Sequence, residues 1–155
     1  MKRLVVIALV ALLATSLTAE TVLICHAQSL PATNADGFQS GVSQTLVDMV
    51  FDKLFDKGDI AFDTAMKDES VDPSAQWLSN LSRSYGASKV VYFRVYWKAG
   101  KEKEVLLDHV SYQLVGPKGD LLKGGNLTAA LVASSSNEVK DSRALGNLLV
   151  NGLTL

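Results

Sequence analysis

Few residues of this chain have the types and spacing that metal binding requires. Cys25 and His26 are adjacent in a sequence of 155 residues, and the other histidine, His109, lies far from them. Neighbouring residues of a strand point to opposite faces, so Cys25 and His26 would not reach one metal ion. Structural metal sites need closely spaced sets of cysteine and histidine, and the sequence has none. We therefore expect no metal ion and no other cofactor.

The motifs of nucleophilic catalysis and phosphate binding are incomplete. Gly41 and Ser43 match the start of a hydrolase elbow, but its second glycine is missing and the segment has a helical pattern. The glycines of residues 119–125 lie between predicted strands, whereas a phosphate-binding loop opens a helix. Four acidic residues have a spacing unlike that of a calcium-binding EF-hand and predict a solvated loop: Asp63, Asp68, Glu69 and Asp72. We expect no enzymatic activity.

A protein-binding surface is the candidate functional feature. Residues 89–97 and 105–115 are rich in β-branched and aromatic residues and predict two adjacent antiparallel strands. Side chains alternate between the faces of a strand, so one face of this pair carries six candidate contact residues: Tyr92, Arg94, Tyr96, His109, Ser111 and Gln113. Tyrosine and arginine combine apolar area with hydrogen-bonding groups and are frequent in interfaces. The alternative is that the last helix covers this face and that the tyrosines are ordinary packing residues.

The first residues have the layout of a secretory signal peptide. Lys2 and Arg3 precede an apolar run over residues 4–13, which gives way to small and polar residues. This run has about half of the roughly twenty residues that cross a bilayer, so it predicts a cleaved signal and not an anchor. We expect residues 1–19 to be removed. Residues 20–155 would then form a single domain in the periplasm or outside the cell, with no stable membrane anchor.

The charge and cysteine content exclude several classes of protein. Without Lys2 and Arg3, the 15 basic residues fall to 13 against 16 acidic residues, and no basic cluster offers a surface for nucleic acid. A single cysteine, Cys25, cannot form an internal disulfide. Ile24 is larger than the small residue that precedes a lipidated cysteine, which argues against a lipoprotein. Cys25 is then a buried thiol of the first strand or forms an intermolecular disulfide.

Hydrophobic periodicity predicts the order of the elements. Strands are expected where β-branched and apolar residues concentrate, at residues 21–27, 60–66, 89–97, 105–115 and 121–132. Helices are expected where apolar residues recur every three or four positions, at residues 37–57, 73–86 and after 137. Asp72 and Pro73 would cap and begin the second helix, and Gly58 and Gly86 would end the first two. These elements predict an α+β domain with a mixed sheet of about five strands packed with three helices, in the order βαβαβββα.

The arrangement of these elements resembles a known group of periplasmic domains. Residues 82–92, Ser-Arg-Ser-Tyr-Gly-Ala-Ser-Lys-Val-Val-Tyr, place Gly-Ala between a helix and a central strand, and residues 116–120 form a Gly-Pro-Lys-Gly-Asp turn. With the first strand and the long helix, these features resemble the α/β domains of the TolB amino-terminal, CsgG and LpoB group over most of the chain. The resemblance implies a non-enzymatic module that binds an envelope protein or assembles with itself.

Two functions are consistent with these features, and a third, a hydrolase, would need converging acid, base and nucleophile side chains that the sequence does not show. The first is an exported protein-binding or assembly module of the bacterial cell envelope, whose partner is another envelope protein or the chain itself. The second is a small-ligand carrier, with an apolar pocket between sheet and helices lined by Trp77 and Trp97. A flat exposed tyrosine face would favour the module, and a discrete unfilled pocket would favour the carrier.

Overall fold

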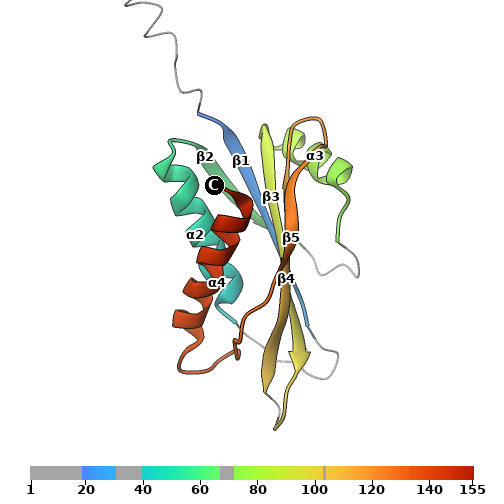
Figure 1. The fold of residues 1–155 in the computed structure, drawn as a ribbon. Coiled ribbons are helices and arrows are strands. Elements are labelled where there is room, and N and C mark those ends of the chain that lie inside the picture. The colour runs from blue at the N-terminus through green and yellow to red at the C-terminus, as the bar shows by residue number, and fades with distance from the viewer. Residues whose placement is uncertain (1–18, 31–39, 67–71, 103) are drawn as a thin grey trace, which may run out of the picture.

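A computed structural model describes residues 19–30, 40–66, 72–102 and 104–155. Its elements, in chain order, are β1 (Thr21–Ser29), α2 (Val42–Asp56), β2 (Ile60–Ala65), α3 (Ala75–Ser84), β3 (Lys89–Ala99), β4 (Val105–Val115), β5 (Leu121–Leu127) and α4 (Glu138–Leu153). The strands form one five-stranded sheet in the order β2-β1-β3-β4-β5 (Figure 1). The predicted α+β class and element order are confirmed. The expected signal peptide, apart from its last residue, and two of the acidic residues, Asp68 and Glu69, lie outside the described residues.

The sheet is mixed, with a parallel half and an antiparallel half. β1 pairs in parallel with both β2 and β3, whereas β4 runs antiparallel to β3 and to β5. The chain steps from β1 to β2 through α2 and then returns past β1 to β3 through α3. Crossovers of one hand that run in opposite directions put their helices on opposite faces of a sheet. This places α2 and α3 on opposite sides, as Figure 1 shows.

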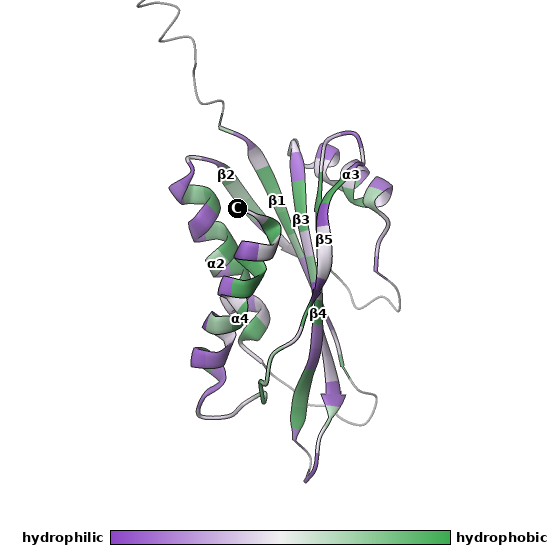
Figure 2. Cartoon of the chain, viewed as in Figure 1, coloured by the Kyte–Doolittle hydropathy of each residue, from purple (hydrophilic) through white to green (hydrophobic). Residues whose placement is uncertain are grey.

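The larger core lies between the sheet and the helices α2 and α4. The predicted inward residues of β3 belong to it: Val91, Phe93, Val95 and Trp97. Leu46 of α2 and Leu149 of α4 are fully buried against them, and Figure 2 shows hydrophobic residues along the inner sides of both helices. None of the described helices has the length and apolar composition needed to cross a bilayer.

The smaller core lies under α3 on the other face of the sheet. It contains Leu23 and Cys25 of β1, Leu78 of α3 and Val90 of β3. Burial raises the pKa of the Cys25 thiol to about 12, so the thiol stays protonated and poorly reactive at neutral pH. The prediction of a buried thiol in the first strand is confirmed.

Three predicted boundaries were wrong. The helix predicted from residue 37 begins at Val42 as α2, and neither Ser40 nor Gly41 is helical. α3 is capped by Ser74, whose hydroxyl oxygen accepts a hydrogen bond from the Trp77 amide at 3.2 Å, and not by Asp72. β5 ends at Leu127, and beyond it only an isolated bridge joins the chain to β4.

Candidate functional site

The six candidate contact residues come together on the face of the sheet that carries α3. They form three cross-strand pairs between β3 and β4: Tyr92 with Gln113, Arg94 with Ser111, and Tyr96 with His109. The last helix packs on the opposite face, so the alternative in which α4 covers these residues was wrong. The segment that leads into α3 lies over them instead.

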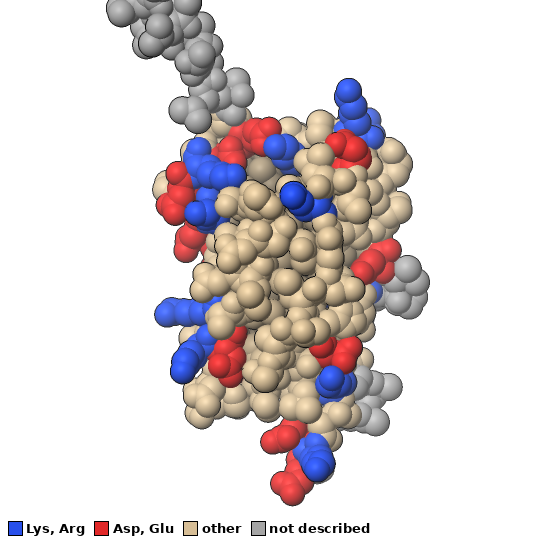
Figure 3. Space-filling view, in the orientation of Figure 1, with Lys and Arg blue, Asp and Glu red and all other residues tan. Residues whose placement is uncertain are grey.

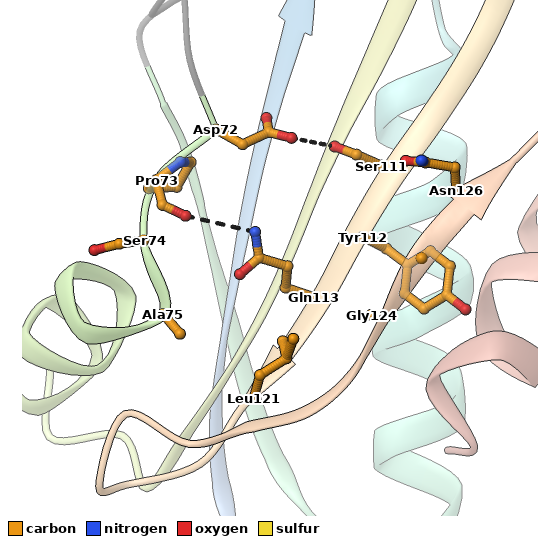
Figure 4. A pocket seen from close by; sticks show the side chains of 11 residues that line it. Asp72, Pro73, Ser74, Ala75, Ser111, Tyr112, Gln113, Leu121, Gly124 and Asn126 are labelled. Carbon is orange, nitrogen blue, oxygen red and sulfur yellow. Dashed lines mark hydrogen bonds between the residues drawn. The ribbon is translucent and has the colours of Figure 1, made fainter.

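An aspartate that sequence reasoning placed in a solvated loop is the centre of this cluster. The hydroxyl groups of Tyr92 and Tyr96 each donate to Oδ1 of Asp72 at 2.9 Å. The hydroxyl group of Ser111 donates to Oδ2 at 2.8 Å, as Figure 4 shows. Nε of Arg94 lies 3.3 Å from Oδ1 in an ion pair. Asp72 therefore ties the start of the α3 segment to two strands of the sheet.

Burial divides the cluster into an inner part and a rim. Tyr92 and Arg94 are fully buried, and Ser111 is buried as well. Tyr96, His109 and Gln113 are partly exposed. The side chains thus share one face as the strand alternation predicted, but they do not form a flat exposed tyrosine surface. We call Tyr96, His109 and Gln113 the rim.

The two tyrosines act as hydrogen-bond donors. Burial raises the pKa of both the Tyr92 and the Tyr96 hydroxyl, and the hydrogen bonds to Asp72 raise it further. Both phenols therefore stay protonated at neutral pH. A protonated phenol that donates to a carboxylate cannot at the same time serve as a general base or a nucleophile.

The rim is held in place by stacking and by charge. The imidazole of His109 stacks on the Tyr96 ring with 4.2 Å between ring centres. Its Nδ1 lies 2.8 Å from Oδ2 of Asp108, whose Oδ1 accepts a hydrogen bond from Lys98 at 2.9 Å. The hydrogen bonds from Lys98 and His109 lower the pKa of Asp108. The Arg94 guanidinium adds a cation–π contact at 5.8 Å from the Tyr96 ring centre.

An open cavity of about 410 Å³ adjoins the cluster between the start of α3 and the strands β4 and β5. Asp72, Ser111, Gln113 and Asn126 contribute its polar groups, and Leu121 contributes apolar area (Figure 4). The Gln113 amide donates to the Pro73 carbonyl at 3.5 Å across it. The cavity therefore meets the rim at Gln113, and it is open and partly polar and not an enclosed apolar pocket.

The pocket expected for a ligand carrier does not form from the two tryptophans. Trp77 lies on α3, where its side chain is partly exposed. Trp97 is buried on the opposite face of the sheet, among the residues that pack against α2 and α4. Its indole N–H donates to Oε1 of Gln28 at 3.0 Å. Side chains on opposite faces of one sheet cannot line the same pocket.

The residues that could bind metals are dispersed in the described part of the chain. Cys25 belongs to the core under α3, whereas His26 stacks near Phe93 on the other face, as strand alternation predicted. Nε2 of His26 lies 3.7 Å from Oδ2 of Asp63. No group of three or more histidine, cysteine, aspartate or glutamate side chains comes together among the described residues.

Comparisons with known proteins establish the fold. No protein-family model and no curated protein matches the chain. Two solved structures of PelC from Paraburkholderia phytofirmans align with TM-scores of 0.54 and 0.53 at 14% identity. The alignments cover 87% of this chain and 87% and 88% of the PelC chains. The chain therefore has the same fold as PelC.

Two further solved structures are more distant. Lipoprotein GNA1162 from Neisseria meningitidis is 16% identical over 87% of this chain and 96% of its own, with a TM-score of 0.47. TolB from Acinetobacter baumannii is 18% identical over 88% of this chain and 28% of its own, with a TM-score of 0.46. The resemblance to the TolB, CsgG and LpoB group stays a prediction from the sequence.

Proposed function

We propose that this chain is an exported protein of the bacterial cell envelope that binds another protein or further copies of itself and catalyses no reaction. The observation that carries the proposal is the partly exposed rim of Tyr96, His109 and Gln113, in which Tyr96 donates a hydrogen bond to Asp72 and His109 stacks on Tyr96. The expected signal peptide, residues 1–19, supports export to the periplasm or beyond.

The geometry of the rim favours protein binding. Two contacts fix the Tyr96 side chain: its hydroxyl group donates to Asp72, and its ring stacks on His109. Side chains that are already ordered lose little conformational entropy when a partner binds. Tyrosine and histidine at a rim also offer apolar area together with hydrogen-bonding groups.

The chemistry of the same groups supports a non-catalytic role. The Ser111 hydroxyl donates directly to the Asp72 carboxylate, with no histidine between them. An activated serine needs a neighbouring base that a third group orients. His109 is bound to Asp108 and lies against Tyr96, so it does not supply that base to Ser111.

The comparison with PelC supports self-association as one form of this function. Both PelC structures are of a dodecamer. The likeness covers most of this chain and most of the PelC chain. We propose that copies of this chain also assemble, in addition to or in place of binding a different envelope protein.

Site-specific crosslinking tests the proposal. A photoreactive amino acid is placed at His109 or Gln113 in the full chain, which is expressed with its leader in a bacterial envelope. The control position is Lys140, which is exposed on α4 on the other face of the sheet. We expect discrete crosslinked species at the two rim positions, absent at Lys140, whose masses identify the partner or a second copy. No crosslink at the rim, or the same species at all three positions, would contradict binding through the rim.

A further inference from the structure

The two outer strands of the sheet are open on their outer sides among the described residues. The amide groups of Ile60 and Met66 donate toward β1. Alternation along a parallel strand therefore turns the backbone groups of the odd-numbered residues 61–65 to the open side of β2. β5 runs antiparallel to β4, which runs antiparallel to β3, so β5 and β2 point in the same direction. Unpaired edges of this kind are templates for pairing with another chain.

Each open edge carries one charge, and the two charges are opposite. Asp63 is the charged residue of β2 and Lys123 that of β5, and both are exposed. Asp63 pairs with Ile24, and Lys123 pairs with Leu114, so both side chains project on the face that carries α2 and α4. Like charges would repel if two β2 edges or two β5 edges met, whereas a β5 edge facing a β2 edge brings opposite charges together.

The helices above these edges expose apolar side chains on their outer sides. Met49 of α2 packs directly on Gly146 of α4, which marks the sides on which the helices face each other. Phe51 and Leu148 each lie two positions further along, about 200° around their helices. They therefore face away from the helix pair, and Phe55, one turn beyond Phe51, does so as well. Phe55 is 71% exposed and Leu148 is 46% exposed.

We propose that copies of this chain associate head to tail through these two sides. The β2 flank (Phe51, Phe55 and Asp63) of one copy would contact the β5 flank (Leu122, Lys123 and Leu148) of the next. Figure 3 shows few charged side chains on the surface over the C-terminal half of α4 and the adjoining part of β5. The inference rests on the self-association form of the proposed function, and it places the contact between copies on the two flanks and not on the rim.

The strand directions and the apolar side chains fit the same arrangement. A parallel pairing that sets Lys123 beside Asp63 brings Leu122 level with Phe62, and it continues the sheet from one copy into the next. Leu148 of one copy then lies on the same face as Phe51 and Phe55 of the next copy. Because the two flanks differ, the contact is heterologous and repeats from copy to copy, closing into a ring or growing as a chain.

Mixing two blocked variants is the direct test, with mass measured by light scattering and native mass spectrometry. Phe55→Glu blocks the β2 flank and Leu148→Glu blocks the β5 flank, and both positions are exposed enough to accept the change. We expect the parent to assemble and each variant to bind at least about tenfold more weakly. An equimolar mixture should give a one-to-one dimer and nothing larger, because each variant keeps one functional flank. Val139→Glu, exposed at the start of α4 and outside both flanks, should leave assembly unchanged.

Charge reversal tests the pairing of the strands. Asp63→Lys or Lys123→Asp alone should weaken assembly, and the double variant should restore it. Charged residues on edge strands can also serve only to prevent association. In that case Lys123→Ala would strengthen assembly, and this result would overturn the proposal.

The remaining outcomes separate this inference from the proposed function. A parent that stays monomeric at every concentration overturns head-to-tail assembly, while crosslinks from His109 to a different protein would keep the proposed function. If the parent assembles and none of the flank variants weakens that assembly, the assignment of the flanks is overturned but self-association is not. Large assemblies in the mixture of blocked variants would also overturn the assignment, because two half-blocked copies can form only one contact.

Discussion

The two faces of the sheet are built from the same strands but are stabilised in different ways. On the face under α2 and α4, β3 contributes Val91, Phe93 and Val95, and the contacts are apolar. On the other face the alternate residues of β3 are Tyr92, Arg94 and Tyr96, which converge on one carboxylate. Apolar burial stabilises a fold without fixing directions, whereas hydrogen bonds to one carboxylate fix positions. We infer that the first face supplies the larger part of the apolar stabilisation and that the second sets the geometry of the rim.

The largest expected change in the free energy of unfolding comes from a substitution on the apolar face. Leu46 is fully buried between α2 and the sheet. Leu46→Ala should lower the free energy of unfolding by about 3 kcal/mol, because it removes buried methyl groups and leaves a cavity. Urea denaturation measures the change, with Val139→Ala at an exposed position as the control. A loss near that of the control would show that this face does not carry the stability of the fold.

A smaller change in the free energy of unfolding, together with a change in tyrosine absorbance, is expected from a substitution on the polar face. Asp72→Ala removes the acceptor of three hydroxyl groups and the ion-pair partner of Arg94. Since it leaves buried donors without this acceptor, the free energy of unfolding should fall by about 2 kcal/mol. Tyrosine absorbance should also change, which a simple loss of packing elsewhere would not cause. The matched control is Asp56→Ala at an exposed position of α2, and equal losses in both variants would contradict the role of Asp72.

The smallest effect concerns pH and the one histidine on the apolar face. Burial lowers the pKa of His26 from its usual 6.5, against the opposing effect of Asp63. Below pH 6.5 the unfolded chain binds more protons than the folded chain at this residue, so stability falls as the pH decreases toward the folded pKa. His26→Gln should flatten this part of the stability profile, measured by urea denaturation between about pH 7 and pH 5. If the free energy of unfolding falls more steeply with decreasing pH in the variant than in the parent, the assignment to His26 is contradicted.

Local patterns account for much of the fold. The alternation in residues 89–97 and the three-to-four spacing in α2 depend on near neighbours, which is why the order of the elements was predicted. Gly58 and Gly86 adopt the positive φ angles that end a helix, as their positions indicated. The order of the strands across the sheet and the face on which α4 packs depend on distant segments. No local pattern indicated them.

The candidate site was predicted only in part for the same reason. Strand alternation placed Tyr92, Arg94 and Tyr96 together, but their burial depends on a segment about twenty residues away that crosses over them. Asp72 stands directly before a proline and a helix, which is typical of a capping residue. Its hydrogen bonds to Tyr92 and Ser111 span 20 and 39 positions of the chain, and no spacing in the sequence indicates them.

Crosslinking at His109 with and without an intact Asp72 cluster is the most direct test of the central claim. The claim is that the cluster holds the rim in the form that a partner binds. Asp72→Asn keeps the size of the side chain and removes its charge, and circular dichroism confirms that the variant is folded. We predict that the crosslink from His109 to its partner is strong in the parent and falls at least about tenfold in the variant. An equal yield from both folded proteins would contradict the claim.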